Sequence, residues 1–534
     1  MTATNGTAPA NGNGDVTTTI TAKAQVSLPP KLSYAELNPK SKPTEFFGPI
    51  GTTLVTFATP LVAYALFFSC NEVTGCSATA SSLSNALNTI GNWPSAAGKL
   101  WDWKAVGVYL AWYAWCIATW VLLPTEWIEG LLLRDGTRQK YKMNGLWFLF
   151  LTLGVAIGVL ARPGGIEHFT WLYDHFVPLY SAALAMSTLQ ALWVYAYSFF
   201  SGELLALGGN SGIFLYDFFI GRPLNPTLPG LPNWDIKTFN EVRPGLSLWF
   251  LLNISCACEQ YVRLGYVTDS MWLVLAFEGW YTVDCYIAEP SILNQMDITT
   301  DGFGFMLAFG DLAWLPFTYG LQARYLTFNP ITLGPVFSAL VIAVEILGLY
   351  IFRVSNNEKS DFRNGKNPKN LTYMDTARGT KLLTSGWWGR SRHPNYLGDW
   401  IMAWAWCLPT GFNTPITYFY VVYFAVLLIH RQRRDDEACR HKYGKDWDRY
   451  VEKVPYRIVP YVVSWLAEIW CELWLTRAVL SLCGVRRSGQ CSHALATAGG
   501  DNRCARRIAA RVAPRNDNLT IESVCLKRLK DDDR

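Results

Sequence analysis

Long apolar runs constrain the fold of this chain more than any other feature. Most have roughly 17 to 25 residues, the length of a helix that crosses the hydrocarbon core of a bilayer. A helix can satisfy its backbone N–H and C=O groups there without water. The runs lie near residues 46–68, 105–123, 145–161, 177–200, 247–264, 270–287, 304–321, 331–352, 396–408 and 416–430. The sequence therefore predicts an all-α, polytopic membrane protein with about ten transmembrane helices.

Composition and charge agree with a membrane domain. The chain is 51% hydrophobic and 15% aromatic, and its charged residues are only 16% of the total. Between Arg353 and Arg392 there are nine Lys or Arg residues against three Asp or Glu residues. By the positive-inside rule this loop should be cytoplasmic. The net charge of +5 is spread along the chain without a basic aromatic face, so we expect no nucleic-acid partner.

Three regions differ in composition. Residues 1–45 lack an apolar period and the segments of a secretory signal, which predicts a disordered cytoplasmic tail. Residues 46–461 form the predicted membrane domain, with a polar C-terminal region at 353–461. Residues 462–534 form an atypical extension, in which 465–485 is apolar but carries charges, as an interfacial helix does.

Cysteines and buried acids leave some alternatives open. The thirteen cysteines lack the paired spacing of a zinc site or a disulfide scaffold, so we expect most to be reduced. We expect Asp297 and Asp301 to cap loops. Glu278, Asp284 and Asp311 lie in apolar surroundings, where they could form either a polar pocket or structural ion pairs.

Two polar clusters flank the last two apolar runs, between Lys381 and Tyr461. A hairpin of two spans would bring them to one membrane surface. Cations for phosphates and rings for a base are what a phosphorylated nucleotide requires. The candidate cations and rings are Lys359, Arg363, Arg392, Arg431, Arg434, Trp388, Tyr443 and Tyr450. A basic cytoplasmic loop that only sets topology is the competing interpretation for most of the single cations.

Other kinds of site fit less well. His393 has no second His or Cys at helical spacing, so we expect no metal. No glycine-rich turn joins a strand to a helix, which excludes a Rossmann site for the nucleotide. Ser385 and Ser391 lack a His and Asp relay, which argues against a hydrolase triad.

Two long motifs resemble the sterol reductase family, most closely its fungal delta-14 members, with the carboxy-terminal domain of the lamin B receptor as a relative. They read LLTSGWWGRSRHPNYLGD and HRQRRDDEACRHKYGKDWDRYVEKVPYRIVPY. The segments DFFIGRPLNPTLPGLPNWDIKTFNEVRPGL and MDITTDGFGFMLAFGDLAWLPFTYGLQARYL are similar to the family as well. The resemblance covers roughly residues 46–461.

The resemblance implies an NADPH-dependent reductase of ergosterol biosynthesis, a multi-pass protein of the endoplasmic reticulum membrane. It implies that the C14=C15 double bond of a sterol is protonated and then takes a hydride. Tyr281 and Asp435 are the expected catalytic residues, and Tyr319 competes with Tyr281 as proton donor. The expected cofactor-binding residues are Lys359, Arg363, Leu383, Trp388, Asn395, Tyr396, Asp435, Cys439, Arg440, His441, Lys442, Tyr443 and Tyr450.

Several alternatives stay open at this point. Relatives that reduce the C7 or C24(28) bond share the cofactor motifs. The RHP and KYG segments also resemble isoprenylcysteine-type methyltransferases, but their S-adenosylmethionine has no phosphate for Lys359 and Arg363 to bind. A structural role at the nuclear envelope would be expected to need a folded domain before the first helix. Besides the sterol and the lipid bilayer, other sterol-biosynthesis enzymes could be partners.

Overall fold

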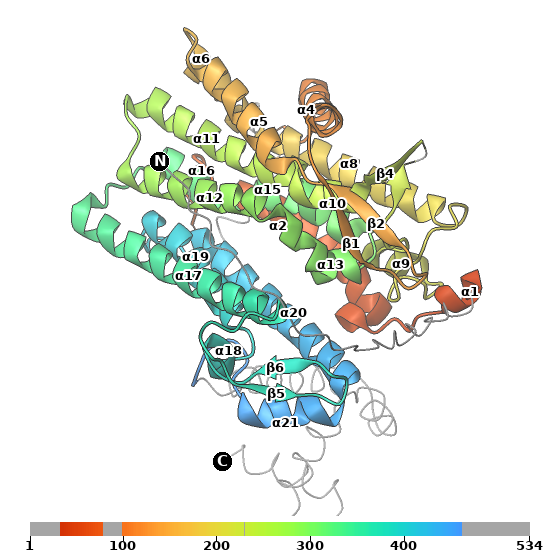
Figure 1. The fold of residues 1–534 in the computed structure, drawn as a ribbon. Helices are drawn as coiled ribbons and strands as arrows, with labels where there is room; N and C mark the ends of the chain where they lie inside the picture. Colours follow the sequence, from red (N-terminus) through yellow and green to blue (C-terminus); the bar gives the residue numbers. More distant parts are fainter. Residues whose placement is uncertain (1–31, 78–98, 229, 462–534) are drawn as a thin grey trace, which may run out of the picture. The chain divides into compact units, whose positions relative to one another are not determined.

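The chain is described by a computed structural model over residues 32–77, 99–228 and 230–461 (Figure 1). It divides into two compact units, Met1–Asn364 with Asn395–Cys439, and Gly365–Pro394 with Arg440–Arg534. In the described part, the strands form three two-stranded sheets and the rest of the regular structure is helical. The first 31 residues of the predicted tail and the predicted interfacial helix at 465–485 lie outside the described residues.

The long helices match the apolar runs of the sequence. They are α2 (Gly48–Ser69), α4 (Trp103–Leu122), α5 (Gly145–Leu160), α8 (Phe176–Tyr197), α11 (Pro244–Leu264), α12 (Asp269–Ile287), α17 (Gly334–Arg363), α19 (Pro394–Cys407) and α20 (Phe419–Tyr443). Among the described residues, four segments are long and apolar enough to cross a membrane: Glu45–Ser69, Trp103–Leu122, Phe176–Tyr197 and Gly334–Arg363. The structure therefore confirms a mostly helical chain with membrane spans, and the number ten stays a prediction.

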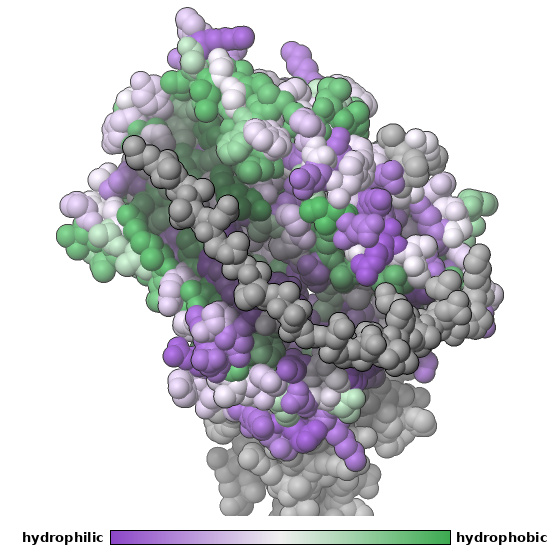
Figure 2. All heavy atoms as spheres, in the orientation of Figure 1, coloured by the Kyte–Doolittle hydropathy of each residue, from purple (hydrophilic) through white to green (hydrophobic). Residues whose placement is uncertain are grey.

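The outer faces of these helices are suited to lipid. On α2 an exposed stripe at helical spacing consists of Ile50, Leu54, Phe57 and Leu61. Figure 2 shows hydrophobic side chains, in green, gathered over the helices, whereas purple hydrophilic side chains cover the hairpin of β1 (Trp127–Leu132) and β2 (Arg138–Lys142). Such an extent of exposed apolar surface marks a membrane interaction rather than a face in contact with water.

The seventh apolar run is interrupted rather than straight. It contains α14 (Phe305–Phe309), the π-helical turn η5 (Gly310–Trp314) and α15 (Leu315–Thr318), and the helix α16 (Leu321–Phe328) follows after a turn. A Cβ atom at Gly320 in that turn would overlap the side-chain oxygen of Asn253 on α11. The absence of a side chain at Gly320 therefore permits the close approach of this turn to α11.

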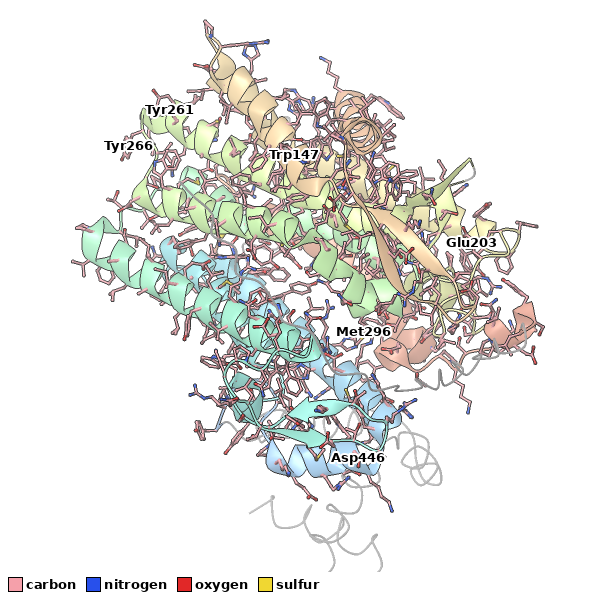
Figure 3. The ribbon with its side chains drawn as sticks, viewed as in Figure 1. Trp147, Glu203, Tyr261, Tyr266, Met296 and Asp446 are labelled. Carbon is pink, nitrogen blue, oxygen red and sulfur yellow. A yellow bond between two sulfur atoms is a disulfide. The ribbon has the colours of Figure 1, made fainter. Side chains whose placement is uncertain are left out.

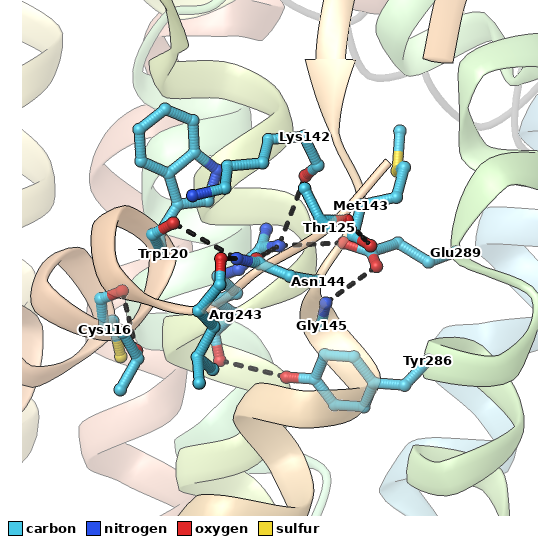
Figure 4. A network of polar contacts seen from close by, with 12 residues as sticks. Cys116, Trp120, Thr125, Lys142, Met143, Asn144, Gly145, Arg243, Tyr286 and Glu289 are labelled. Carbon is cyan, nitrogen blue, oxygen red and sulfur yellow. Dashed lines mark hydrogen bonds and ion pairs between the residues drawn. The ribbon is translucent and has the colours of Figure 1, made fainter. Parts of the chain in front are cut away.

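The segment between α8 and α11 contains two short helices and a two-stranded sheet. It comprises α9 (Phe214–Ile220), β3 (Thr227–Leu228), β4 (Leu231–Asp235) and α10 (Ile236–Val242). A buried network follows it, in which Arg243 donates to Asn144 at 2.7 Å and to Glu289 at 3.0 Å (Figure 4). Glu289 in turn accepts from the backbone N–H of Gly145 at 2.8 Å. The ion pair thus joins the beginnings of α5 and α11 to η4 (Glu289–Asn294), which follows α12.

Residues 32–45 are ordered, which differs from the predicted disordered tail. Ser33 and Glu36 form a capping box at α1 (Tyr34–Leu37). Asn38 accepts from the N–H of Leu205 at 2.8 Å, and Asn210 donates to the carbonyl of Asn38 at 3.0 Å. Polar side chains therefore order this segment by hydrogen bonds, although it has no apolar period.

The cysteines follow the prediction only in part. Cys116, Cys256, Cys258, Cys285, Cys407 and Cys439 are free, as expected. Cys70 and Cys76, by contrast, form a disulfide that closes the turn after α2. Its sulfurs are buried in a hydrophobic cluster with residues of α11, α12 and α16. Because the spacing resembled no known scaffold, the sequence did not predict this bond.

Candidate active site

Three helices of the first unit bring several predicted cofactor residues together. Lys359 and Arg363 lie four residues apart near the end of α17, so they share one helix face. The hydroxyl of Tyr396 on α19 donates to Asp435 Oδ2 on α20 at 3.0 Å. Burial raises the pKa of the Asp435 carboxyl, whereas the Tyr396 hydrogen bond and the nearby charge of Lys359 lower it. The side chains of Lys359, Tyr396 and Asp435 therefore form one polar group.

Close helix packing supports this group. A Cβ atom at Gly398 of α19 would lie 2.5 Å from the backbone N of Phe352 and 2.7 Å from the carbonyl of Gly348, both on α17. Only the absence of side chains lets two backbones approach so closely. Trp400 donates from Nε1 to the carbonyl of Val421 at 3.2 Å, which joins α19 to α20.

Two further predicted cations have carboxylate partners. Arg431 donates to Asp297 at 2.7 Å, and Arg434 binds both oxygens of Asp301 at 2.6 and 2.9 Å. Arg434 also lies 3.4 Å from Glu45. The prediction that Asp297 and Asp301 cap loops is wrong for their side chains, because each pairs with a guanidinium, Asp301 through both of its oxygens. Carboxylates thus already occupy these two arginines.

Asn395 and Cys439 complete the predicted residues of the first unit. Asn395 is half-buried at the start of α19, and no described residue bonds its Oδ1 atom. Cys439 is a half-buried free cysteine one helical turn after Asp435.

The other predicted cofactor residues belong to the second unit. This unit contains β5 (Tyr373–Asp375), β6 (Lys381–Leu383), α18 (Trp387–Arg390) and α21 (Lys445–Lys453). Leu383, Trp388 and Tyr450 are buried, and the Tyr450 hydroxyl donates to the carbonyl of Trp388 at 3.4 Å. The side chains of Arg440, His441 and Lys442 are exposed, and that of Tyr443 is half-buried.

Backbone contacts hold this small unit together. Arg392 donates to the carbonyls of Val454 and Pro455 at 2.9 and 3.0 Å, so its charge serves the fold rather than a phosphate. Asp446, labelled in Figure 3, accepts from the N–H of Ala377 at 2.6 Å. The hydrogen bonds join α21 to the β5–β6 hairpin and to the segment before α19.

The two candidate proton donors share one set of aromatic rings. The ring of Trp249 lies 6.2 Å from that of Tyr281 and 6.0 Å from that of Tyr319. Trp406 lies 5.1 Å from Tyr281 and stacks on Tyr420 at 5.2 Å, and Tyr420 lies 4.7 Å from Tyr319. We call these five residues the aromatic cluster. Its two tryptophans and Tyr420 are buried, whereas Tyr281 and Tyr319 are half-buried.

The acidic residues near the aromatic cluster have separate roles. Glu278 is fully buried, accepts from Asn253 at 2.5 Å, and has a second oxygen, Oε1, that no described residue bonds. Asp284 pairs with Arg353 on α17, so the structural interpretation holds for it. Asp311 lies on the π-helical turn, and its Oδ2 has no partner in the described part of the chain. Glu278 and Asp284 both lie within one helical turn of Tyr281, and Asp284 is the one that pairs with a cation.

Comparison with known proteins decides the family. Residues 40–463 match the model of the ergosterol biosynthesis ERG4/ERG24 family. The chain belongs to this family of sterol reductases. The resemblance read from the two long motifs is thereby confirmed, and the match ends close to Tyr461, where the resemblance stops.

Curated relatives of this sterol reductase are fungal. The chain is 48% identical over 423 residues to Delta(14)-sterol reductase erg24 of Schizosaccharomyces pombe, covering 78% of this chain and 97% of the relative. It is 43% identical over 457 residues to Delta(14)-sterol reductase ERG24 of Candida albicans, covering 81% and 100%. It is 46% identical over 367 residues to Delta(14)-sterol reductase ERG24 of Saccharomyces cerevisiae, covering 66% and 83%.

Sequence reasoning missed part of the aromatic cluster of this sterol reductase. Trp249, Trp406 and Tyr420 come from three different helices, and nothing in their spacing predicts that they meet. The available signal for such a cluster was the aromatic content of the chain, which is 15%.

Proposed function

We propose that this chain is a delta-14 sterol reductase, which uses NADPH to reduce the C14=C15 double bond of a sterol intermediate in ergosterol biosynthesis. The observation that carries the proposal is 48% identity with a protein of that name across 97% of its length. The same name recurs for the relatives at 43% and 46% identity. Identity of 48% that extends over 423 residues supports the same choice of double bond.

NADPH is the cofactor that suits the polar residues of the chain. Lys359 and Arg363 are on one face of α17, as a phosphate group requires. Asp435 can accept hydrogen bonds from ribose hydroxyls, and Asn395 can donate to or accept from an amide. Leu383, Trp388, Tyr396, Cys439, Tyr450 and the segment from Arg440 to Tyr443 would complete the binding residues. When bound, NADPH supplies a hydride.

The protein must first make the alkene a hydride acceptor. We assign the hydroxyl of Tyr281 as the proton donor. Its transfer to C15 forms a C–H bond with the two electrons of the C14=C15 double bond, which leaves positive charge on C14. The aromatic cluster stabilises this charge through its ring faces. A hydride supplied by bound NADPH would complete the reduction at C14, and the Tyr281 phenolate would regain a proton once the product leaves.

Glu278 and Asp435 would support these steps without contacting the alkene themselves. The buried carboxyl group of Glu278, one turn before Tyr281, would supply a polar oxygen beside the forming cation. Asp435 accepts a hydrogen bond from the hydroxyl of Tyr396, and its negative charge balances the positive charge of Lys359. Exclusion of water by the surrounding tryptophans prevents capture of the cation by solvent.

A ten-helix arrangement in the endoplasmic reticulum membrane belongs to the same proposal. The four candidate spans and the shorter apolar helix Gly145–Leu160 support a multi-pass protein. Helices with buried polar faces, such as α11 and α12, supply further spans because the protein interior covers those faces. The basic loop after α17 would then be cytoplasmic.

The direct test is sterol reduction by membranes that contain the full chain. Membranes receive a sterol with double bonds at C8 and C14, with or without NADPH, and the products are resolved by mass spectrometry. We expect NADPH-dependent gain of two hydrogens at C14=C15. An Asp435→Asn chain at equal membrane level serves as the inactive control. Reduction only of a C7 or C24(28) sterol in parallel reactions would overturn the choice of bond.

A further inference from the structure

Asp399 on α19 is an acid that the proposed reduction does not yet use. It is half-buried, and no described residue donates a hydrogen bond to its carboxyl group. The cation near it is Arg431 on α20, whose charge attracts an ionised Asp399. Arg431 donates to Asp297 at 2.7 Å, so its hydrogen bond serves another carboxylate. The Asp399 carboxyl group is therefore available to gain and lose a proton.

The direction of Asp399 follows from its neighbours along α19, which is one continuous helix. Gly398 meets the backbone of α17, and Trp400 donates to a carbonyl of α20. Successive residues of a helix differ in direction by roughly 100°, so Asp399 points between α17 and α20. Trp406 lies about two turns further on the same face, and its ring is 5.1 Å from that of Tyr281. Asp399 therefore faces the interior on the side where Tyr281 lies.

The same face of α19 joins the two parts of the proposed site. Tyr396, one turn before Asp399, belongs to the polar group through its hydrogen bond to Asp435. Trp406, about two turns after Asp399, belongs to the aromatic cluster. The charge of an ionised Asp399 acts on the hydroxyl of Tyr281, so these two groups are near each other. The other titratable groups that Asp399 faces are Cys285 on α12, Glu345 on α17 and Tyr420 on α20.

We propose that Asp399 is the acid that returns a proton to Tyr281 after each turnover. This inference rests on the proposed function, in which Tyr281 loses its proton to C15. The O–H bond of the Asp399 carboxylic acid breaks, an O–H bond forms on the Tyr281 phenolate, and the electrons of the broken bond stay on Asp399 as a carboxylate. The transfer is downhill because a phenolate is a far stronger base than a carboxylate, and one bridging water can carry the proton. The charge of Arg431 stabilises the carboxylate until solvent water, entering beside Tyr396, restores the acid.

The rates of first and later turnovers separate this role from a structural one. Asp399→Asn nearly preserves side-chain volume but cannot supply a proton. When the enzyme in membranes exceeds a C8,C14-diene sterol, the resting Tyr281 already carries its proton, so the single-turnover rate should stay within about threefold of the wild type. When the sterol is in excess, kcat should fall about 100-fold or more, the contribution of a positioned acid. Asp399→Glu, which keeps the acid, should restore most of kcat.

Asp311→Asn is the matched control, because Asp311 is also half-buried but lies near Tyr319. It should keep the wild-type ratio of kcat to single-turnover rate, and a selective fall of kcat in this variant too would overturn the assignment. In the wild-type chain, which needs no stable variant, rising pH should lower kcat as Asp399 loses its proton and leave the single-turnover rate unchanged. Equal changes in the two rates, or an unchanged kcat in Asp399→Asn, would also overturn the assignment. A wild-type chain that reduces no sterol would instead refute the proposed function.

Discussion

Single side chains in the aromatic cluster decide how the reaction begins. The ring centroids of Tyr281 and Tyr319 lie 6.2 and 6.0 Å from that of Trp249, so ring packing does not decide which tyrosine is the proton donor. Their surroundings do. Tyr281 is one turn from the buried carboxyl group of Glu278, whereas Tyr319 lies against the rings of Tyr420 and Tyr423. A polar oxygen near the donor stabilises the cation that protonation creates, which favours Tyr281.

Removal of one hydroxyl should separate the two tyrosines. We expect Tyr281→Phe to lower kcat about 100- to 10,000-fold, the usual contribution of a positioned acid. Tyr319→Phe should stay within tenfold of the wild type, because its ring still packs on Tyr420. The measurement is sterol turnover in membranes at equal protein level, with Tyr420→Phe as the control. The opposite order of the two variants would transfer the donor role to Tyr319.

The cations at the end of α17 should determine cofactor affinity. Replacing both Lys359 and Arg363 with Ala should raise the apparent KM for NADPH far more than that for sterol, since each lost contact costs about 1.5 to 3 kcal/mol. Lys366, a loop residue two positions after the first unit's Asn364, provides the matched control as Lys366→Ala. An unchanged NADPH dependence in the double variant would refute the phosphate assignment.

Among the elements, α17 and α19 show how small residues position the polar group. Gly348 and Gly398 let the two backbones touch, and the same two helices carry Lys359 and Tyr396. A separation of the helices would move the cation away from Asp435. The site thus depends on a helix crossing that lies before Lys359 on α17 and directly after Tyr396 on α19.

A single methyl group should disturb that crossing. Gly398→Ala would place a Cβ atom 2.5 Å from the backbone of Phe352, so the helices must shift. We expect a lower unfolding temperature in detergent and a higher apparent KM for NADPH. Gly154→Ala on α5 is the control, because a Cβ atom there meets nothing within 4 Å and alanine favours a helix. Equal unfolding temperatures for the Gly398 variant and the wild type would contradict the role of the crossing.

The sequence predicts some elements better than others. Apolar length predicts α2 at 46–68 against the observed Gly48–Ser69, since a bilayer requires a continuous helix of that size. It does not predict the π-helical turn. It does not predict the break at Gly320 either, where the backbone lies against the side chain of Asn253. The Tyr396–Asp435 hydrogen bond fits the predicted hairpin, but the carboxylate partners of Arg431 and Arg434 come from a distant loop that no local pattern identifies.

At the scale of the whole molecule, the family match ends at residue 463 and the chain continues to 534. The described polar groups and the aromatic cluster both precede that point. Tyr450 is the predicted cofactor residue nearest the C-terminus, and its hydroxyl donates to the carbonyl of Trp388. The extension is therefore an addition to a chain that already holds every residue assigned a role.

Truncation tests this division. A chain that ends after Ser464 should retain sterol reduction in membranes, within about twofold of the full chain. A chain that ends after Gly444 removes α21 with Tyr450 and should be inactive, which makes it the matched control. Sterol analysis at equal membrane levels is the measurement. Inactivity of the longer truncation would show that the extension contributes to the reaction.

The disulfide after α2 gives that helix two chemically different ends. Disulfides persist in oxidising compartments and are reduced in the cytosol. Cys70 and Cys76 follow one end of α2, whereas Glu45, just before the other end, lies beside Arg434. A membrane-crossing α2 therefore separates an oxidising space from its own beginning, where Glu45 lies beside Arg434 of α20. The proposed NADPH residues would then draw on the cytosolic pool of reduced nucleotide, while the bond itself stays out of reach of cytosolic thiols.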